Sequence, residues 1–203
     1  MVVTESAAAD GRHLATVPGM TGTLAGRHVL MVVAPENFRD EELLEPRAAF
    51  EAAGAVVEVA AATTAVARGM LGAQVRPDLA LAAVDPHRYA GVVLVGGSGA
   101  PAHLWGDETL HDILRAARAD GTPIGAICLA PAALARAGLL RGLQATVYAD
   151  ARARKELAEG GARYVTDRVV TDGGIVTAAG PRDARGFAQA MVTAMAPPGH
   201  PPY

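Results

Sequence analysis

The chain has 203 residues, of which 51% are hydrophobic, 19% charged and 4% aromatic, and its formal net charge is −3. This length suits one domain with a sizeable core, and the high hydrophobicity excludes intrinsic disorder. The lack of a basic excess and the scarcity of aromatic rings argue against nucleic-acid binding. No apolar run approaches the roughly 20 residues that cross a bilayer, so we expect a soluble protein with no nucleic-acid or membrane partner.

A single cysteine, Cys128, rules out an internal disulfide framework and any multi-cysteine metal site. The N-terminal segment does not resemble a secretory signal, because Glu5, Asp10 and His13 interrupt any apolar stretch. We therefore expect a cytoplasmic protein. The composition predicts a flexible extension over 1–26, one domain over 27–196 and a Pro-rich tail over 197–203.

Short apolar runs alternate with longer helical patterns from position 28 onward, which is typical of βαβ units with strands buried on both faces. The pattern predicts an α/β fold with a mostly parallel sheet. The predicted strands are 28–34, 55–60, 79–84, 91–95, 123–127, 145–148, 169–170 and 175–178, with a hairpin-like stretch over 67–75. The predicted helices are 43–53, 107–120, 130–137 and 182–195; Gly54 closes the first, and Asp107 caps and Gly121 ends the second.

Cys128 lies where an apolar strand gives way to a helix, which is the position of a nucleophile elbow. Ala126 and Ala130 stand two places on either side, as the small residues of such a turn do. A helix N-terminus favours thiolate, so this interpretation predicts a depressed pKa for Cys128. The alternative is that Cys128 fills space, since free cysteine is among the most buried residue types.

A carboxylate-rich segment, 36–46, follows the first strand, and ligands of open α/β sheets bind beyond the carboxyl ends of strands. Acidic residues also suit the first turn of any helix, so most of these carboxylates are expected to be solvated, with Asp40 as the N-cap. Pro46 lies too far inside the helix for the first position after that cap. The helix is therefore either kinked or begins near Glu45.

A glycine turn over 94–101 follows another strand, and its N–H groups could form an anion nest or an oxyanion hole. It lacks the Lys-Ser/Thr of a phosphate-binding loop, so no nucleotide cofactor is expected. Ser98 lies in this turn, and His103 and His111 follow it. The two histidines have no ligand partners in register, so no metal site is expected.

In combination, these segments resemble the ThiJ/PfpI superfamily over about residues 28–195. The resemblance rests on Glu42-Leu-Leu-Glu-Pro46, the Gly96-Gly97 turn, Ala126-Ile-Cys128-Leu-Ala-Pro131, and Gly180-Pro181 before an apolar helix with Phe187. It implies a flavodoxin-like three-layer α/β/α sandwich that forms a homodimer or a larger homo-oligomer. It also implies that Cys128 is the nucleophile, that Glu42 hydrogen-bonds it, and that Gly97 and Leu129 supply the oxyanion-hole N–H groups.

The chain departs from the family pattern in two places. PfpI-type members carry a histidine directly after the cysteine, where this chain has Leu129, and a glutamate after the Gly-Gly pair, where Pro101 and Ala102 stand. The proposed protease triad is therefore absent. Tyr148 occupies the place of a histidine found in deglycase-type members. Because tyrosine is a poor base near pH 7, proton transfer would depend on Glu42.

The resemblance implies a cysteine enzyme without a cofactor that acts on small reactive carbonyl compounds, as a glyoxalase or deglycase does. In it, Cys128 forms a hemithioacetal and Glu42 relays protons, with Tyr148, Ser98 and His103 as auxiliary candidates. One alternative is a redox-sensing or chaperone-like stress protein that uses oxidation of Cys128. A PfpI-like cysteine peptidase is the other alternative.

Overall fold

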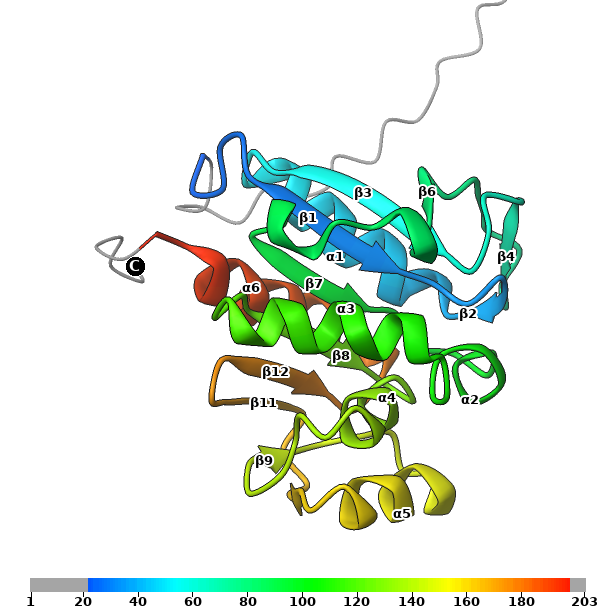
Figure 1. Ribbon diagram of the computed structural model, residues 1–203, viewed down its shortest axis with the longest axis vertical. Coiled ribbons are helices and arrows are strands. Elements are labelled where there is room, and N and C mark those ends of the chain that lie inside the picture. Colours follow the sequence, from blue (N-terminus) through cyan, green and yellow to red (C-terminus); the bar gives the residue numbers. More distant parts are fainter. Residues whose placement is uncertain (1–21, 198–203) are drawn as a thin grey trace, which may run out of the picture.

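The computed structural model describes residues 22–197 (Figure 1). A central sheet of seven strands has the order β11-β12-β8-β7-β1-β3-β6, and all neighbours are parallel except β11 and β12. Its strands are β1 (His28–Val32), β3 (Val56–Ala61), β6 (Leu79–Ala80), β7 (Gly91–Leu94), β8 (Ile124–Ile127), β11 (Val169–Asp172) and β12 (Ile175–Ala178). The fold is thus α/β with a mostly parallel sheet, as the sequence pattern predicts.

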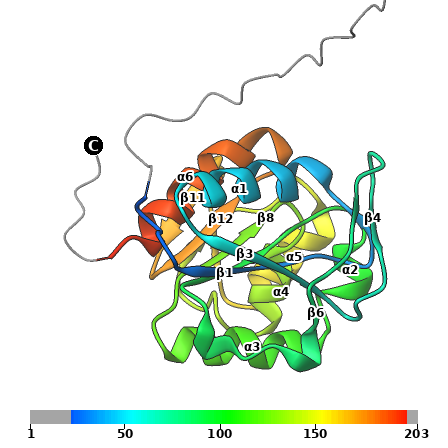
Figure 2. The same ribbon diagram turned by 90° about the horizontal axis from the view of Figure 1, so that it is seen from above.

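Helices cover both faces of this sheet, which gives the three layers seen in Figure 2. One face is covered by α1 (Asp40–Ala52) and α6 (Ala184–Met195), which pack against each other. The other is covered by α3 (Glu108–Ala119) and α4 (Pro131–Arg136), while α5 (Ala151–Glu159) packs on α4. The short helix α2 (Ala100–His103) follows β7.

The central strands β1, β7 and β8 are almost entirely apolar because each contributes to two cores. In β1, Val29 and Met31 belong to the cluster beneath α1 and α6, whereas Leu30 and Val32 belong to the cluster beneath α3 and α4. All four side chains are fully buried. Alternation along a strand sends successive side chains to opposite faces, so a strand covered on both sides shows no polar positions.

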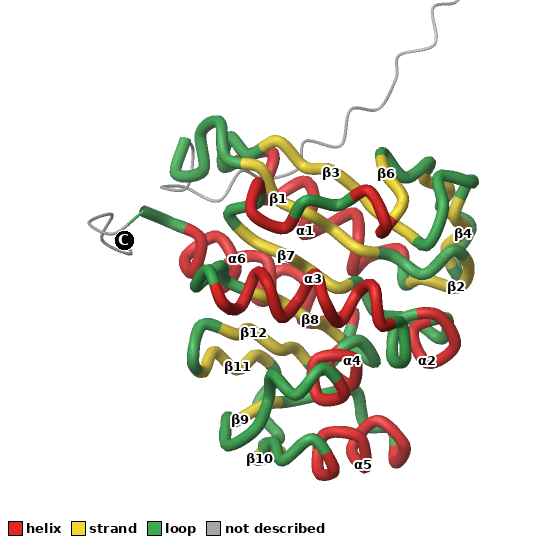
Figure 3. The backbone as a smooth tube through the Cα atoms, in the orientation of Figure 1, coloured by secondary structure: helices red, strands yellow, loops and turns green. Residues whose placement is uncertain are grey.

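Two smaller sheets lie beside the central one (Figure 3). The first joins β2 (Glu36–Phe38), β4 (Ala67–Gly69) and β5 (Gln74–Val75), and the β4–β5 pair is the hairpin expected over 67–75. The second pairs β9 (Gln144–Ala145) with β10 (Arg163–Tyr164). The sheet of β2, β4 and β5 extends the edge at which the central parallel strands end. The sheet of β9 and β10 lies beside β11.

Four sequence-based expectations are wrong in detail. The expected strand over 79–84 is only two residues long and then turns into a 3-10 helix over Leu81–Ala83. The expected strand over 145–148 ends at Ala145, because the following N–H of Thr146 bonds the Thr177 hydroxyl at 3.0 Å. Helix α5 was not expected. The first helix begins at Asp40 rather than 43 or 45, and it continues through Pro46.

The predicted N-cap is confirmed for α3 and wrong for α1. Asp107 caps α3 by accepting from the N–H of Leu110 at 2.9 Å, as expected. Asp40 does not cap α1: it is the first helical residue, the N-cap is Arg39, and no side chain accepts a bond there. The Asp40 carboxylate instead receives the N–H groups of Leu71 and Ala73 from the β4–β5 hairpin.

The packed part of the chain begins before residue 27. Leu24 is fully buried beneath α1, and its N–H donates to the carbonyl of Ala53 at 2.8 Å. The rest of the expected extension, 1–21, and the tail from 198 onward lie outside the described residues. Within residues 22–197, no helix has the length and apolarity to cross a membrane.

Candidate functional site

Three connections meet at one edge of the sheet, beyond the carboxyl ends of β1, β7 and β8. These strands are neighbours in the order β8-β7-β1, and the arrowheads of β1 and β7 point to the edge where β2 and α2 lie (Figure 1). The chain winds away from β1 toward β3 on one side and toward β7 on the other. Such a change of direction is where open α/β sheets form their ligand sites.

Cys128 follows β8 directly and has a positive φ of 60°. A non-glycine residue in this left-handed region is strained by roughly 1–2 kcal/mol, and such strain persists only where the surroundings hold it. The N–H of Cys128 donates to the Ala178 carbonyl and its carbonyl accepts from the Tyr148 N–H, both at 2.9 Å. Ala126 and Ala130 are fully buried on either side. The elbow geometry expected from the sequence is present.

Gly96 and Gly97 let two other segments approach this elbow. A Cβ on Gly96 would lie 2.6 Å from Glu42 Oε2 and 2.7 Å from the Cβ of Cys128, so the glycine allows both side chains to share one space. Gly97 has a φ of 108°, and a Cβ there would overlap the backbone of residues 37–39. The N–H of Arg39 also donates to the Gly96 carbonyl at 2.9 Å. The glycine turn is therefore sealed against the start of α1.

Glu42 is fully buried at this junction and Asp40 is 5% exposed, whereas the other carboxylates of 36–46 are exposed or partly exposed. Its Oε2 accepts the Gly96 N–H at 3.0 Å, while Oε1 has no hydrogen-bond partner in the part of the chain that the structure describes. Burial raises the pKa of Glu42 to about 8, although the nearby Cys128 thiol, the Gly96 N–H and the charge of Arg39 act in the opposite direction. The neutral form of Glu42 is therefore favoured near pH 7, and the ionised form is also accessible.

Burial also raises the pKa of the Cys128 thiol, to about 12, which corrects the expectation of a depressed value. The thiol is 6% exposed, so the loss of hydration of a thiolate outweighs the N-terminus of α4, which has only six residues. An ionised Glu42 raises the pKa further. The backbone N–H groups of Gly97 and Leu129 act in the opposite direction and lower the pKa of the thiol.

The remaining candidates surround this pair at different depths. Ser98 is exposed in the glycine turn. Tyr148 is 48% exposed and packs its ring against Gly180. Nε2 of His103, in α2, lies 3.6 Å from Oε1 of Glu36, in β2. His103 therefore pairs with that carboxylate and forms no bond with Cys128.

Sequence reasoning missed Arg39, whose guanidinium acts electrostatically on both Glu42 and Cys128. The side chain is held by Glu41 through two hydrogen bonds of 2.7 and 2.8 Å. Its position directly before the acidic helix that carries Glu42 was the available signal. Arg39 therefore places a positive charge at the rim of the site, and the carboxylate of Glu41 balances it.

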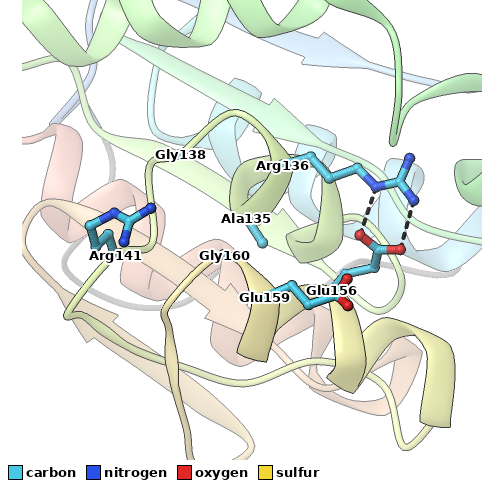
Figure 4. Close-up of a pocket in the computed structure, with 7 residues that line it drawn as sticks. All are labelled: Ala135, Arg136, Gly138, Arg141, Glu156, Glu159 and Gly160. Carbon is cyan, nitrogen blue, oxygen red and sulfur yellow. Dashed lines mark hydrogen bonds and ion pairs between the residues drawn. The ribbon is translucent and has the colours of Figure 1, made fainter.

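A separate surface pocket of about 290 Å³ lies between α4 and α5 (Figure 4). Its lining includes Arg136, Arg141, Glu156 and Glu159, and it contains none of the candidate residues. Arg136 and Glu156 pair with each other through two hydrogen bonds. No group of three or more His, Cys, Asp or Glu side chains within residues 22–197 is arranged to hold a metal ion.

Comparison with known proteins identifies the family. The family model described as DJ-1/PfpI matches residues 27–194. The chain belongs to the DJ-1/PfpI family. It is 41% identical over 167 residues to an uncharacterised protein of Methanocaldococcus jannaschii, covering 82% of each chain. It is 30% identical over 154 residues to a protein of Pyrococcus furiosus named Deglycase PfpI, covering 76% of this chain and 91% of the relative.

Solved structures of the family share the architecture. A ThiJ/PfpI domain protein from Brachyspira murdochii superposes with a TM-score of 0.80 at 29% identity, covering 84% of this chain and 97% of the other. The DJ-1/PfpI fold is thus common to both chains. The match spans the segments that carry Glu42, the Gly96-Gly97 turn and Cys128.

Proposed function

We propose that this DJ-1/PfpI protein is a cysteine enzyme that acts on small reactive carbonyl compounds, such as 2-oxoaldehydes or their adducts, without a cofactor. The observation that carries the proposal is the buried pair of Glu42 and Cys128, in which the pKa of Glu42 lies near 8. A catalytic acid–base group works best when its pKa lies close to the working pH, because both of its forms are then available.

Addition of the thiol to an aldehyde would be the first step. The Cys128 sulfur forms a bond to the carbonyl carbon, and the electron pair of the carbonyl bond moves to the oxygen. The N–H groups of Gly97 and Leu129, which act on the thiol, stabilise the charge on that oxygen. The reactive form of the pair carries one proton: the ionised Glu42 takes the thiol proton and passes it to the oxygen, so the product is a neutral hemithioacetal, Glu42 is left ionised and no electrons are exchanged.

Glu42 would then relay a proton between the two carbons of a 2-oxoaldehyde. Oε2 accepts from Gly96, which places the acidic proton of the neutral form on the unpartnered Oε1. The ionised form takes the proton from the former aldehyde carbon and returns it to the neighbouring carbon, while the hydroxyl proton of the hemithioacetal passes to the neighbouring oxygen. Water releases the resulting thioester as a 2-hydroxy acid, so the net reaction adds one water to the substrate.

The burial of Cys128 favours a small substrate over a peptide. With 6% of the residue exposed, the sulfur is accessible to a two- or three-carbon aldehyde more readily than to a folded or extended backbone. The positions of the family's protease histidine and glutamate hold Leu129 and Pro101 or Ala102. The peptidase alternative is therefore weaker, and the name deglycase of the relative from Pyrococcus furiosus supports carbonyl chemistry.

A redox-sensing role depends on the same pair and makes a different prediction. A protonated Glu42 could stabilise a sulfinate on Cys128, but oxidation proceeds through thiolate, which a raised pKa makes scarce. The raised pKa of the thiol slows addition to an aldehyde as well, so the name deglycase of the relative from Pyrococcus furiosus is what ranks turnover of carbonyl compounds above sensing.

Steady-state assays of the pure protein with methylglyoxal and glyoxal test the proposal. We expect Cys128→Ala and Cys128→Ser to lower turnover at least about 10³-fold, because the covalent step is lost. Equal turnover by Cys128→Ala would contradict the mechanism. No turnover by the wild type, together with rapid conversion of Cys128 to sulfinate by peroxide, would favour the sensor instead.

A further inference from the structure

The two backbone N–H groups that act on the Cys128 thiol, those of Gly97 and Leu129, come from different connections of the fold. Gly97 follows β7, and Leu129 follows β8. Their separation is set by whatever joins these two connections near the sulfur. The side chain that does so is Trp105, which lies eight residues beyond Gly97 in the same connection and donates its indole N–H to the Leu129 carbonyl at 2.7 Å.

Trp105 is itself held on several sides. It is 1% exposed, and its carbonyl accepts from Nε2 of the buried His111 at 3.1 Å. The guanidinium carbons of Arg136 and Arg152 lie 5.6 and 5.7 Å from the centre of the indole ring, within the range of cation–π attraction. The indole therefore has little freedom to move away from Leu129.

The arginine above the ring is in turn fixed by α5. Figure 4 shows Arg136 and Glu156 joined by two parallel bonds, of 2.7 and 2.6 Å. Such forked pairs give geometric specificity as well as energy. Because Arg136 belongs to the helix that follows the elbow, α5 holds α4 and the ring of Trp105 in one arrangement.

We propose that Trp105 is a positioning residue of the candidate site, and that its indole N–H holds Leu129 so that the Leu129 N–H points at the sulfur of Cys128. The same bond braces the turn that follows Cys128, whose φ of 60° is strained. The arrangement also assigns α5 a role in the site, although α5 contributes no residue to it. The inference rests on the proposed function for turnover, but its effect on the thiol is independent of turnover.

Trp105→Phe tests the inference because it removes the indole N–H and retains an aromatic ring beneath the two arginines. We expect alkylation of Cys128 by iodoacetamide at pH 8.5 to slow roughly threefold, because a misaimed Leu129 N–H stabilises thiolate less. We expect kcat on methylglyoxal to fall about tenfold while KM changes less than twofold, because the N–H acts on charge formed in the transition state.

Arg115→Met is the matched control. Arg115 also reaches from the connection after β7 to a backbone carbonyl after β8, since its Nε donates to Ala137 at 3.3 Å, but it does so at the far end of α4. Normal alkylation and kcat in Arg115→Met, together with the changes in Trp105→Phe, would support the inference. Normal values in both variants, or equal losses in both, would overturn it.

If Trp105→Phe lowers Tm by more than about 10 °C, its effects could come from loss of stability, and Glu156→Gln is then the variant to use. It loosens Arg136 without touching the buried ring, so a smaller slowing of alkylation in the same direction is expected. Alkylation equal to that of Arg115→Met would overturn the inference. If the wild type turns over no aldehyde, the proposed function fails, while the alkylation rates of these variants still decide the role of Trp105.

Discussion

Asp40 and Glu42 are two buried carboxylates in the first turn of one helix, and their surroundings differ. Both oxygens of Asp40 accept backbone N–H groups of the β4–β5 hairpin, at 2.7 and 2.8 Å. Glu42 has one such bond, to Gly96, and its second oxygen has no partner among residues 22–197. A fully bonded buried carboxylate stabilises a fold, whereas a half-bonded one beside a thiol is available for chemistry.

The pH dependence of stability should give the largest contrast. The pKa of Glu42 is about 8 in the folded protein and near 4.5 otherwise, so between these values the native state holds a proton that the unfolded chain has lost. Stability is then fully present below about pH 4.5 and is lost as the pH rises through 8. We expect the wild type to lose about 3–5 kcal/mol relative to Glu42→Gln between pH 5 and 8.5.

Urea unfolding of both proteins at several pH values measures this difference. Glutamine does not titrate, and its side chain can accept from Gly96 as Glu42 does. If the free energy of unfolding changed with pH equally in both proteins, Glu42 would be ionised in the native state at neutral pH. The comparison with Asp40 would then fail.

The catalytic contrast is expected to be of similar size. Glu42→Gln retains the shape and a donor but cannot relay a proton, so kcat on methylglyoxal should fall about 10²-fold, equivalent to about 2.7 kcal/mol. Glu42→Leu should be lower still. Glu41→Gln is the control, since Glu41 lies at the rim in a pair with Arg39, and less than a threefold change is expected. Equal losses in both glutamine variants would reduce the effect of Glu42 to general electrostatics.

The smallest of these contrasts concerns Asp40, which holds the β4–β5 hairpin. Asp40→Asn turns one acceptor into a donor that faces a backbone N–H of the hairpin, so we expect about 2–3 kcal/mol of destabilisation. Hydrogen exchange at the Leu71 and Ala73 amides should become faster, while the alkylation rate of Cys128 should stay within twofold. A large change in alkylation would show that the two carboxylates act as one unit.

Local sequence signals worked where a helix or turn depends on its own residues. The cap of α3 at Asp107 and the β4–β5 hairpin are confirmed, because an aspartate cap and a glycine turn act over a few residues. Helix α5 was missed although it carries comparable signals: Asp150 accepts from the Ala153 N–H at 2.9 Å, and Gly160 follows the last residue. Its mostly polar sequence hid it from a search for apolar periodicity.

For the candidate site, the sequence predicted which residues meet but did not predict their burial. Glu42, Gly97, Cys128 and Leu129 were named from sequence, and the structure brings them to one edge of the sheet. The buried state of Glu42 was not predictable from the helix, because acidic residues in a first turn are usually solvated. The glycine at position 96 decides it, since only a residue without a side chain leaves room for the carboxyl group there.

The sequence by itself determined the parallel α/β sheet, most of its strands and the identity of the residues at their carboxyl ends, because periodicity and glycine turns are properties of short segments. Only the tertiary structure decided the chemical state of those residues. The pKa of Glu42 rises and that of Cys128 rises with it because segments more than 50 residues apart exclude water from both groups. Desolvation depends on packing, which no local pattern records.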